Sequence, residues 1–300
     1  MKLSDFNMVT GCGDNDRVII KYKDICYIGC FKGTREEAIK AISINYTGPE
    51  KDAYITKIDE LYSTDITTYK ERGIDITVDN NFVMRSAGFN GHSEIIKYLV
   101  KCGVDLRFNN DFATQLASSN GHLEVVKYLV SQGADITTDD NSAIQRASRN
   151  GHLKIVKYLV SQGADVTANN NLAVQWASGN GYLNVVKYLV KHGADVTAND
   201  NYAVQIASEN GYLNVVKYLV KHGADVTADD NYPLQSASSN GHLKVVKYLV
   251  KHGADVTAGD NYAVVWASQC GYLKVVKYLL SQGASLDQKN IANNSLCLLF

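Results

Sequence analysis

The sequence predicts a mainly α-helical solenoid of about seven helix-pair repeats, preceded by a small α+β module. One observation is a unit of thirty residues that recurs in phase from Asn81 to Asn290. A second is that each copy holds two short apolar stretches of helical spacing, separated by a glycine. A unit of this length cannot bury its apolar face alone, so it must be stabilised by stacking on its neighbours. Two glycine columns mark the period: Gly91, Gly121, Gly151, Gly181, Gly211, Gly241 and Gly271, and Gly103, Gly133, Gly163, Gly193, Gly223, Gly253 and Gly283.

The copy from Asn201 to Asp230 shows how one unit is expected to fold. A first helix ends where Asn210-Gly211 allows positive φ, so that the chain can reverse. A second helix spans Tyr212 to His222, and Gly223 caps its C-terminus. Ala224 to Thr227 is predicted to be extended, before a polar turn that begins the next helix. The expected apolar faces are Ala203, Val204, Ile206 and Ala207 in the first helix and Leu213, Val216, Leu219 and Val220 in the second, and the polar turn is Asp229, Asp230 and Asn231.

These residues resemble the ankyrin repeat. The string Gly211-Tyr212-Leu213-x-Val215-Val216-x-x-Leu219-Val220-x-x-Gly223-Ala224-Asp225 matches the family's second helix and the turn after it. The family's unit has about 33 residues and opens with Thr-Pro-Leu-His, whereas this unit opens with Tyr202-Ala203-Val204-Gln205. Counting between the two glycine columns places the missing residues in the turn that usually forms a projecting β-hairpin, so we expect blunted fingers. The shortened units are most similar to those of ankyrin proteins from giant DNA viruses of protists, of the mimivirus type.

Four segments are expected along the chain. Residues 1–62 do not follow the repeat and predict a ββαα module that caps the array, with a hairpin in 17–31. Its two helices are expected to begin at the capping box Thr34-Arg35-Glu36-Glu37 and near Glu50. Residues 63–80 form a degenerate half-repeat, and residues 81–290 form the array. The tail, residues 291–300, is apolar and is expected to cover the last helix pair.

Charge and composition argue against several functional classes. Thirty basic and thirty-one acidic residues give a net charge of −1, which favours neither nucleic acid nor an anionic membrane as partner. The N-terminus has no apolar signal core and no long apolar run follows, so we expect a cytoplasmic chain. The six cysteines follow no paired framework, which is typical of a reducing compartment. Cys26 and Cys30 have no histidine within 60 residues, so we interpret them as thiols rather than zinc ligands.

No arrangement of catalytic or metal-binding residues stands out. Gly11-Cys12-Gly13 is too short for a phosphate-binding loop, and residues 1–62 contain no histidine to activate a nucleophile. Histidines recur in the array, but equivalent positions in adjacent repeats lie roughly 8–10 Å apart, too far to share a zinc ion. We interpret them as groups for repeat packing and helix-end polarity: His92, His122, His152 and His242, and His192, His222 and His252. We therefore expect no enzyme, no metal site and no cofactor.

A lysine column suggests nucleic-acid binding at first sight, but an acidic column accompanies it. Acids among the lysines would weaken contacts with phosphates. Because screening acts over about 8 Å, lysines one repeat apart barely repel. We interpret the lysines as a solvated face. The columns are Lys97, Lys127, Lys157, Lys187, Lys217, Lys247 and Lys277, and Asp105, Asp135, Asp165, Asp195, Asp225 and Asp255.

Two columns of the first helix differ from copy to copy. Column A holds Ser86, Leu116, Arg146, Trp176, Ile206, Ser236 and Trp266, and column B holds Phe89, Ser119, Arg149, Gly179, Glu209, Ser239 and Gln269. The resemblance implies that first helices line the concave side and that these positions contact partners. Tryptophan and arginine are enriched in binding hot spots, although tryptophan here could equally pack between repeats. The candidate partner-binding residues are Leu116, Arg146, Arg149, Trp176, Ile206, Glu209, Trp266 and Gln269.

The sequence therefore predicts a non-enzymatic scaffold that binds a protein partner in its concave groove. If the viral resemblance holds, the partner is a host protein and the setting is host cytoplasm; we expect a monomer. The alternative is a structural or virion-associated spacer. A third possibility, an enzyme or sensor in residues 1–62, lacks convergent polar groups.

Overall fold

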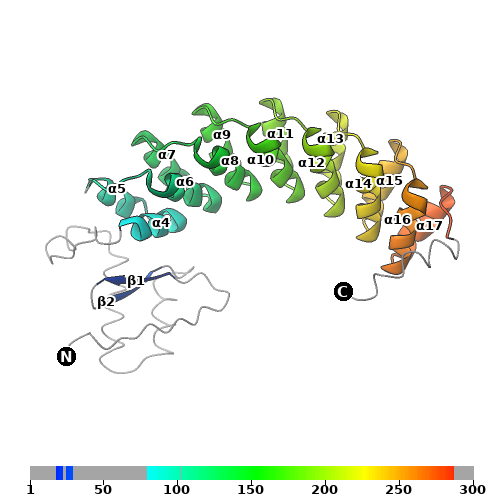
Figure 1. The fold of residues 1–300 in the computed structure, drawn as a ribbon, viewed down its shortest axis with the longest axis horizontal. Helices are drawn as coiled ribbons and strands as arrows, with labels where there is room; N and C mark the ends of the chain where they lie inside the picture. The colour runs from blue at the N-terminus through cyan, green and yellow to red at the C-terminus, as the bar shows by residue number, and fades with distance from the viewer. Residues whose placement is uncertain (1–17, 23–24, 30–79, 102, 287–300) are drawn as a thin grey trace, which may run out of the picture. The chain divides into compact units, whose positions relative to one another are not determined.

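The computed structural model of the chain describes residues 18–22, 25–29, 80–101 and 103–286 (Figure 1). The chain divides into two compact units between Ala134 and Asp135, and each unit is described by itself. The expected helices of residues 34–62, the half-repeat up to residue 79 and the apolar tail at 291–300 lie outside the described residues.

The first unit contains the predicted hairpin and two helix pairs. Strand β1 (Val18–Tyr22) pairs antiparallel with β2 (Ile25–Gly29), with Val18 opposite Gly29, which confirms the expected hairpin. Helix α4 packs against α6, and α5 against α7, so first helices stack on first helices and second on second. The bounds are α4 (Asn80–Asn90), α5 (Ser93–Lys101), α6 (Phe108–Asn120) and α7 (Leu123–Ser131).

The second unit is a row of five helix pairs with the same stacking. Figure 1 shows this row bending, with the first helix of each pair on the inner side and the second helix on the outer side. The first helices are α8 (Thr138–Arg149), α10 (Ala168–Gly179), α12 (Ala198–Glu209), α14 (Ala228–Ser239) and α16 (Ala258–Gln269). The second helices are α9 (Leu153–Ser161), α11 (Leu183–Lys191), α13 (Leu213–Lys221), α15 (Leu243–Lys251) and α17 (Leu273–Ser281).

The core of each pair lies between its two helices and against the neighbouring pair. In α12 the buried apolar residues are Ala203, Val204 and Ala207, as predicted, whereas Ile206 is half-buried. In α13 they are Val215, Val216 and Leu219, which includes a valine that was not predicted. Leu213 and Val220 are only half-buried because, at 100° per residue, they fall at the edges of the arc centred on that trio.

The link between repeats is a left-handed turn rather than a hairpin finger. Asn199, Asp200 and Asn201 have φ of 54°, 52° and 63°, and the right-handed helix begins only after them. No strand occurs between the described helices from α4 to α17, which fits the expected trimmed fingers. The prediction that Ala224 to Thr227, before the next left-handed turn, is extended is wrong for Val226 and Thr227, which form a tight turn. There the Asp225 side chain accepts hydrogen bonds from the Thr227 amide at 2.8 Å and hydroxyl at 2.7 Å, which pulls the chain back on itself.

Asparagine holds each of the five left-handed turns of the second unit in place, and glutamine adds a second bond in four of them. Asn201 Oδ1 accepts a hydrogen bond from the Asp225 amide at 2.8 Å, which ties the start of a unit to its closing loop. Gln205 Nε2 donates to the Asp200 carbonyl at 2.7 Å. Both bonds recur along the second unit, at Asn141, Asn171, Asn231 and Asn261 and at Gln145, Gln175 and Gln235. Asparagine and aspartate tolerate this backbone region better than other non-glycine residues, so the polar turn is a conformational requirement.

Candidate functional site

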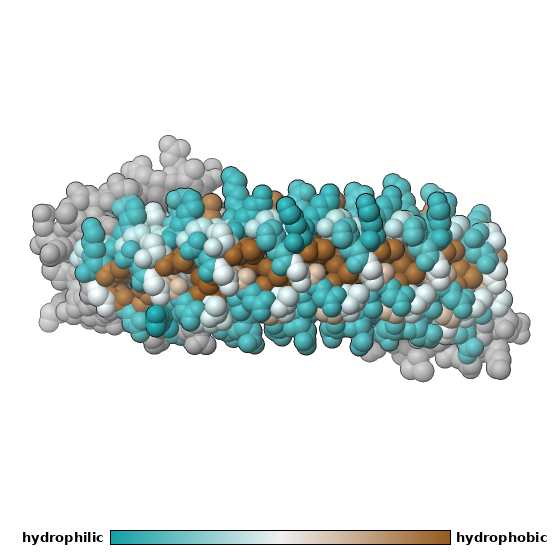
Figure 2. Space-filling model, turned by 90° about the horizontal axis from the view of Figure 1, so that it is seen from above, coloured by the Kyte–Doolittle hydropathy of each residue, from teal (hydrophilic) through white to brown (hydrophobic). Residues whose placement is uncertain are grey.

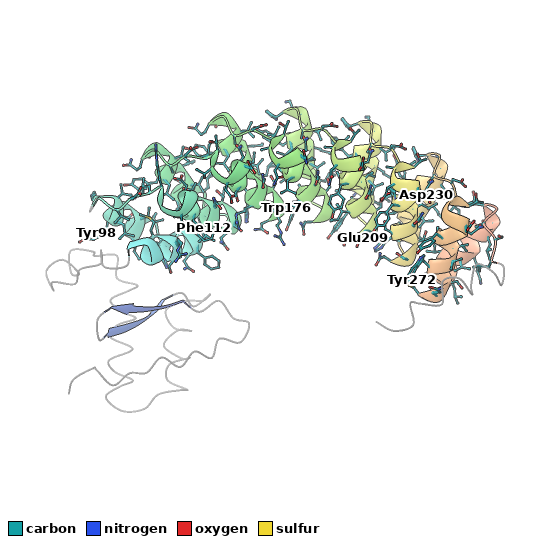
Figure 3. The ribbon with its side chains drawn as sticks, viewed as in Figure 1. Tyr98, Phe112, Trp176, Glu209, Asp230 and Tyr272 are labelled. Atoms are coloured by element: carbon teal, nitrogen blue, oxygen red, sulfur yellow. The ribbon has the colours of Figure 1, made fainter. Side chains whose placement is uncertain are left out.

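The candidate site is a strip along the first helices of the second unit. Column A residues there are half-buried, except for Ser236, which is buried. In column B, Arg149, Glu209 and Gln269 are exposed and Gly179 is buried. The strip therefore combines anchored side chains with exposed polar ones, and Figure 3 shows Trp176 and Glu209 on the inner side of the row.

Arg149 and Trp176 form a cation–π pair in the strip. They come from adjacent first helices, α8 and α10, and the guanidinium carbon lies 5.2 Å from the centre of the indole ring. An arginine over a tryptophan face at this distance stabilises both groups by roughly 0.5–1 kcal/mol at an exposed site. Trp176 is thus neither free in solvent nor fully buried between repeats. Its orientation is fixed by a charged neighbour that is itself exposed.

Arg146 is held by its own helix. Its Nε donates a hydrogen bond to Ser142 Oγ at 2.9 Å, one helical turn earlier. The two arginines therefore give α8 a local positive charge on the strip, which the acids Asp139 and Asp140 of the same helix offset at its N-terminal turn.

Gly179 and Ile206 repeat the pairing of column B with column A. A β-carbon placed on Gly179 would lie 3.0 Å from two carbons of the Ile206 side chain, so these positions are in contact across α10 and α12. The glycine leaves Ile206 room to lie flat against the neighbouring helix. Column B of one repeat and column A of the next therefore form one continuous surface, rather than two separate ridges.

A third variable column, column C, was missed by the sequence reasoning. It lies one helical turn before column A and holds Phe112, Ser142, Leu172, Tyr202, Tyr232 and Tyr262. Tyr202 and Tyr232 are 37% and 39% exposed. Burial, and then the negative charge of Glu209, raise the pKa of the Tyr232 hydroxyl. The sequence alone could have identified column C as variable, because its residues change from phenylalanine, serine and leucine in the early repeats to tyrosine in the last three.

The remaining candidates are divided between the two units. Trp266 packs against Tyr262 with ring centres 5.6 Å apart, and its indole nitrogen is buried with no hydrogen-bond partner among the described residues. Gln269 is exposed at the end of the same helix, α16. Leu116 is half-buried on α6 and belongs to the first unit, so it is not part of the strip.

The histidines serve helix ends, as predicted. His192 Nδ1 lies 2.8 Å from the Tyr188 carbonyl, where the ring N–H donates, and its ring packs on Tyr188 with centres 4.0 Å apart. His122 Nε2 lies 2.9 Å from the Phe89 carbonyl of the preceding repeat. Burial, and then the nearby His122, lower the pKa of His92. Among the described residues no group of His, Cys, Asp and Glu is arranged to hold a metal ion.

The helices from α4 to α17 are all too short or too polar to cross a bilayer, within the part of the chain that the structure describes. The strip offers aromatic rings at Trp176 and Trp266, the guanidinium of Arg149 over the Trp176 ring, and the exposed carboxylate of Glu209.

The architecture and the strip define an α-solenoid of helix-pair repeats. The family model for ankyrin repeats in three copies matches residues 83–170, 169–230 and 206–290. The chain therefore belongs to the ankyrin repeat family, whose repeats generally mediate protein–protein interactions. Among solved structures, the human ASB11 ankyrin repeat domain has a similar fold, with a TM-score of 0.60 and 19% identity, covering 68% of this chain and 99% of that one. Among curated proteins, no sequence matches this chain.

Proposed function

We propose that this protein is a non-enzymatic scaffold that binds a partner protein along the strip formed by columns A, B and C of the second unit. The observation that carries the proposal is the Arg149–Trp176 stack, in which a half-buried tryptophan is held in place at 5.2 Å by an exposed arginine. Tryptophan, tyrosine and arginine are the residues most enriched in binding hot spots. The strip gathers all three on the inner side of a row of stacked helices.

The mechanism is preorganisation. A side chain that is already immobile loses less conformational entropy on binding, and each mobile side chain that becomes ordered costs roughly 0.5–1.5 kcal/mol. Trp176 is stacked, Arg146 is hydrogen-bonded to Ser142, and Ile206 lies against Gly179. Because the left-handed turns replace projecting fingers, the helix faces carry more of the contact than in repeats of full length.

The charges of the strip suggest which partner surface it fits. The positive groups are Arg146 and Arg149 on α8, and the negative group further along is Glu209 on α12. Between them, α10 carries no charged side chain. A partner with an acidic patch next to an apolar centre would match this order, since charge complementarity fixes register across an interface.

The setting extends this proposal. The protein is a viral factor that engages a host protein in the host cytoplasm, acts as a monomer and binds neither nucleic acid nor membrane through the strip. The similarity of the shortened units to those of giant-virus ankyrin proteins supports the viral origin. Without that origin, the scaffold role remains the same.

Affinity capture with variant proteins tests the proposal. We expect Arg149→Ala with Trp176→Ala to reduce recovery of a partner about tenfold or more, because a hot spot costs at least about 2 kcal/mol. Gln162→Ala is the matched control, since Gln162 is exposed at the end of α9 on the other layer. Equal recovery with the double variant and the control, from proteins that unfold at the same temperature, would remove the strip assignment.

The alternative role as a spacer in a virion or assembly predicts a different result. A spacer would be present in purified particles in fixed proportion to the other structural proteins, and the strip variants would assemble normally. An interaction scaffold would instead be recovered with one host protein in a strip-dependent way.

A further inference from the structure

The second helices of the second unit carry a positively charged surface, although the net charge of the whole chain is close to zero. Helices α9, α11, α13, α15 and α17 contain eleven lysines and no aspartate or glutamate. All of these lysines are exposed. They are Lys154 and Lys157, Lys187 and Lys191, Lys217 and Lys221, Lys244, Lys247 and Lys251, and Lys274 and Lys277, and together they are named the lysine face. Figure 2 shows hydrophilic side chains in repeated rows along this array, on either side of a narrow apolar band.

The first unit shows what is missing from the lysine face. There Glu94 pairs with Lys97 at 2.6 Å and Glu124 with Lys127 at 2.9 Å, each three residues apart on one helix. The pairing with Glu94 also raises the pKa of Lys97. In the second unit the glutamate position holds Lys154, Asn184, Asn214, Lys244 and Lys274. None of the described lysines there has a carboxylate within 4.0 Å.

The acidic column does not neutralise this face. Its members, such as Asp165 and Asp255, lie in the closing loops beyond the second helices, and each accepts hydrogen bonds from the threonine two residues later. Aspartates and lysines alternate along the sequence, but in the fold the aspartates lie in the closing loops and the lysines lie on the second helices. The lysine positive charge is therefore available to a partner.

Tyrosine rings contact lysines of the lysine face. Lys157 lies 5.7 Å from the ring centre of Tyr188 in the next repeat, and Lys247 lies 5.4 Å from that of Tyr278. Lys187 and Lys217 make the same contact with Tyr218 and Tyr248, at 5.9 Å each. In four of the five pairs, one lysine is thus placed against a tyrosine at a regular interval along the outer side of the row.

We propose that the lysine face binds an extended acidic polypeptide segment of a partner protein. Neighbouring second helices lie roughly 8–10 Å apart, and three residues of an extended chain span about 10 Å. A segment with an acidic residue at every third position would therefore present one carboxylate to each lysine-bearing helix. Because this site uses the opposite layer from the strip, it does not depend on the proposed function.

Two other anionic partners fit less well. Single-stranded nucleic acid binds by stacking bases on aromatic rings, but the rings of Tyr188, Tyr218, Tyr248 and Tyr278 are already covered by lysines. A flat bilayer would touch few repeats at once, because the second helices lie on the outer side of the bend (Figure 1). A flexible chain can follow that curve over all five pairs.

The test installs the glutamates of the first unit in the second. In the full chain, Asn184→Glu with Asn214→Glu places a carboxylate three residues before Lys187 and Lys217, as Glu94 stands before Lys97. These changes add an acid near a helix N-terminus and improve helix propensity, so the fold is preserved. Asn184→Gln with Asn214→Gln is the uncharged control.

The probe is a labelled peptide of roughly 15 residues, long enough to cross five repeats, with glutamate at every third position and serine between. We expect saturable, salt-sensitive binding that weakens about tenfold in the glutamate variant, since two exposed ion pairs together reach about that factor. The glutamine control, and separately Trp176→Ala, retain it. Absence of binding by the wild type, equal binding by the glutamate variant, or tighter binding of oligothymidylate or phosphatidylserine vesicles would overturn the proposal.

Discussion

At the residue scale, each glycine column has a different reason to be glycine. Gly211 has φ of +75°, and a β-carbon there would lie 2.5 Å from Nδ1 of His242 in the next repeat. Gly223 has φ of +101° but nothing within 4 Å of the same added atom. Where another described repeat follows, as at Gly211, the first column is thus set by backbone conformation and by repeat packing together; the second column, like Gly271 in the last repeat, is set by backbone conformation alone.

This difference predicts unequal costs for one substitution. We expect Gly223→Ala to lower the free energy of unfolding by about 1–2 kcal/mol, as for a residue forced into the left-handed region. Gly211→Ala should cost about 2–4 kcal/mol, because overpacking adds to that strain. Urea unfolding followed by circular dichroism measures both. Equal costs at the two positions would mean that the contact with His242 relaxes freely.

The closing-loop aspartates give a prediction about pH. Hydrogen bonds from the Thr167 hydroxyl, and then its amide, lower the pKa of Asp165 below its usual 3.8. The folded pKa is below the unfolded one, so this contribution is complete above pH 3.8 and is lost as pH falls through the lowered value. Thr167→Val removes the larger cause and keeps the amide. In an NMR titration we expect the Asp165 midpoint to rise part of the way towards 3.8, and an unchanged midpoint would contradict the assigned cause.

At the element scale, the left-handed turn decides how one repeat follows another. Within it Asn199 and Asn201 have similar backbone angles, but only Asn201 accepts the hydrogen bond from the Asp225 amide. The chain already places glycine at the position equivalent to Asn199, at Gly259.

Substitution by glycine separates the role of asparagine in tolerating a left-handed backbone from its role as a hydrogen-bond acceptor. Asn199→Gly relieves strain and should leave stability unchanged or raise it by up to about 1 kcal/mol. Asn201→Gly relieves the same strain but loses the bond, which is worth about 0.5–1.5 kcal/mol, so it should not stabilise. Thermal unfolding of the two variants is the measurement. A more stable Asn201→Gly would show that the bond contributes little.

The sequence predicted these elements well because their determinants are local. The Asn-Gly pairs and the spacing of Val216 and Leu219 predicted both helices and the reversal between them. The left-handed turn was missed as a conformation, because Asp and Asn indicate a turn without indicating three consecutive residues of positive φ. The half-burial of Ile206 and Leu213 depends on how helices tilt across repeats, which a periodic pattern does not report.

At the scale of the whole molecule, the second unit presents two chemically different layers. Its first helices carry the aromatic and arginine strip, and its second helices carry the lysine face. The variable columns could be found from the sequence, but the stack of Arg149 on Trp176 joins residues 27 positions apart and needed the packing of adjacent helices. The lysine face was not predicted for the same reason. The net charge of the sequence counts the loop aspartates together with the helix lysines, although the fold keeps the two apart.

Both layers exist only if thirty residues are the stacking unit, so deletion of one unit tests the account most directly. Removing residues 201–230 joins Asp200 to Asn231 and keeps every column in register. Removing residues 201–215 alone breaks the register and leaves half a pair. Unfolding should remain cooperative after the first deletion, with a lower unfolding free energy and the same mean helicity per residue, whereas the second deletion should abolish cooperative unfolding of the second unit. Equal damage from the two deletions would contradict the stacked array.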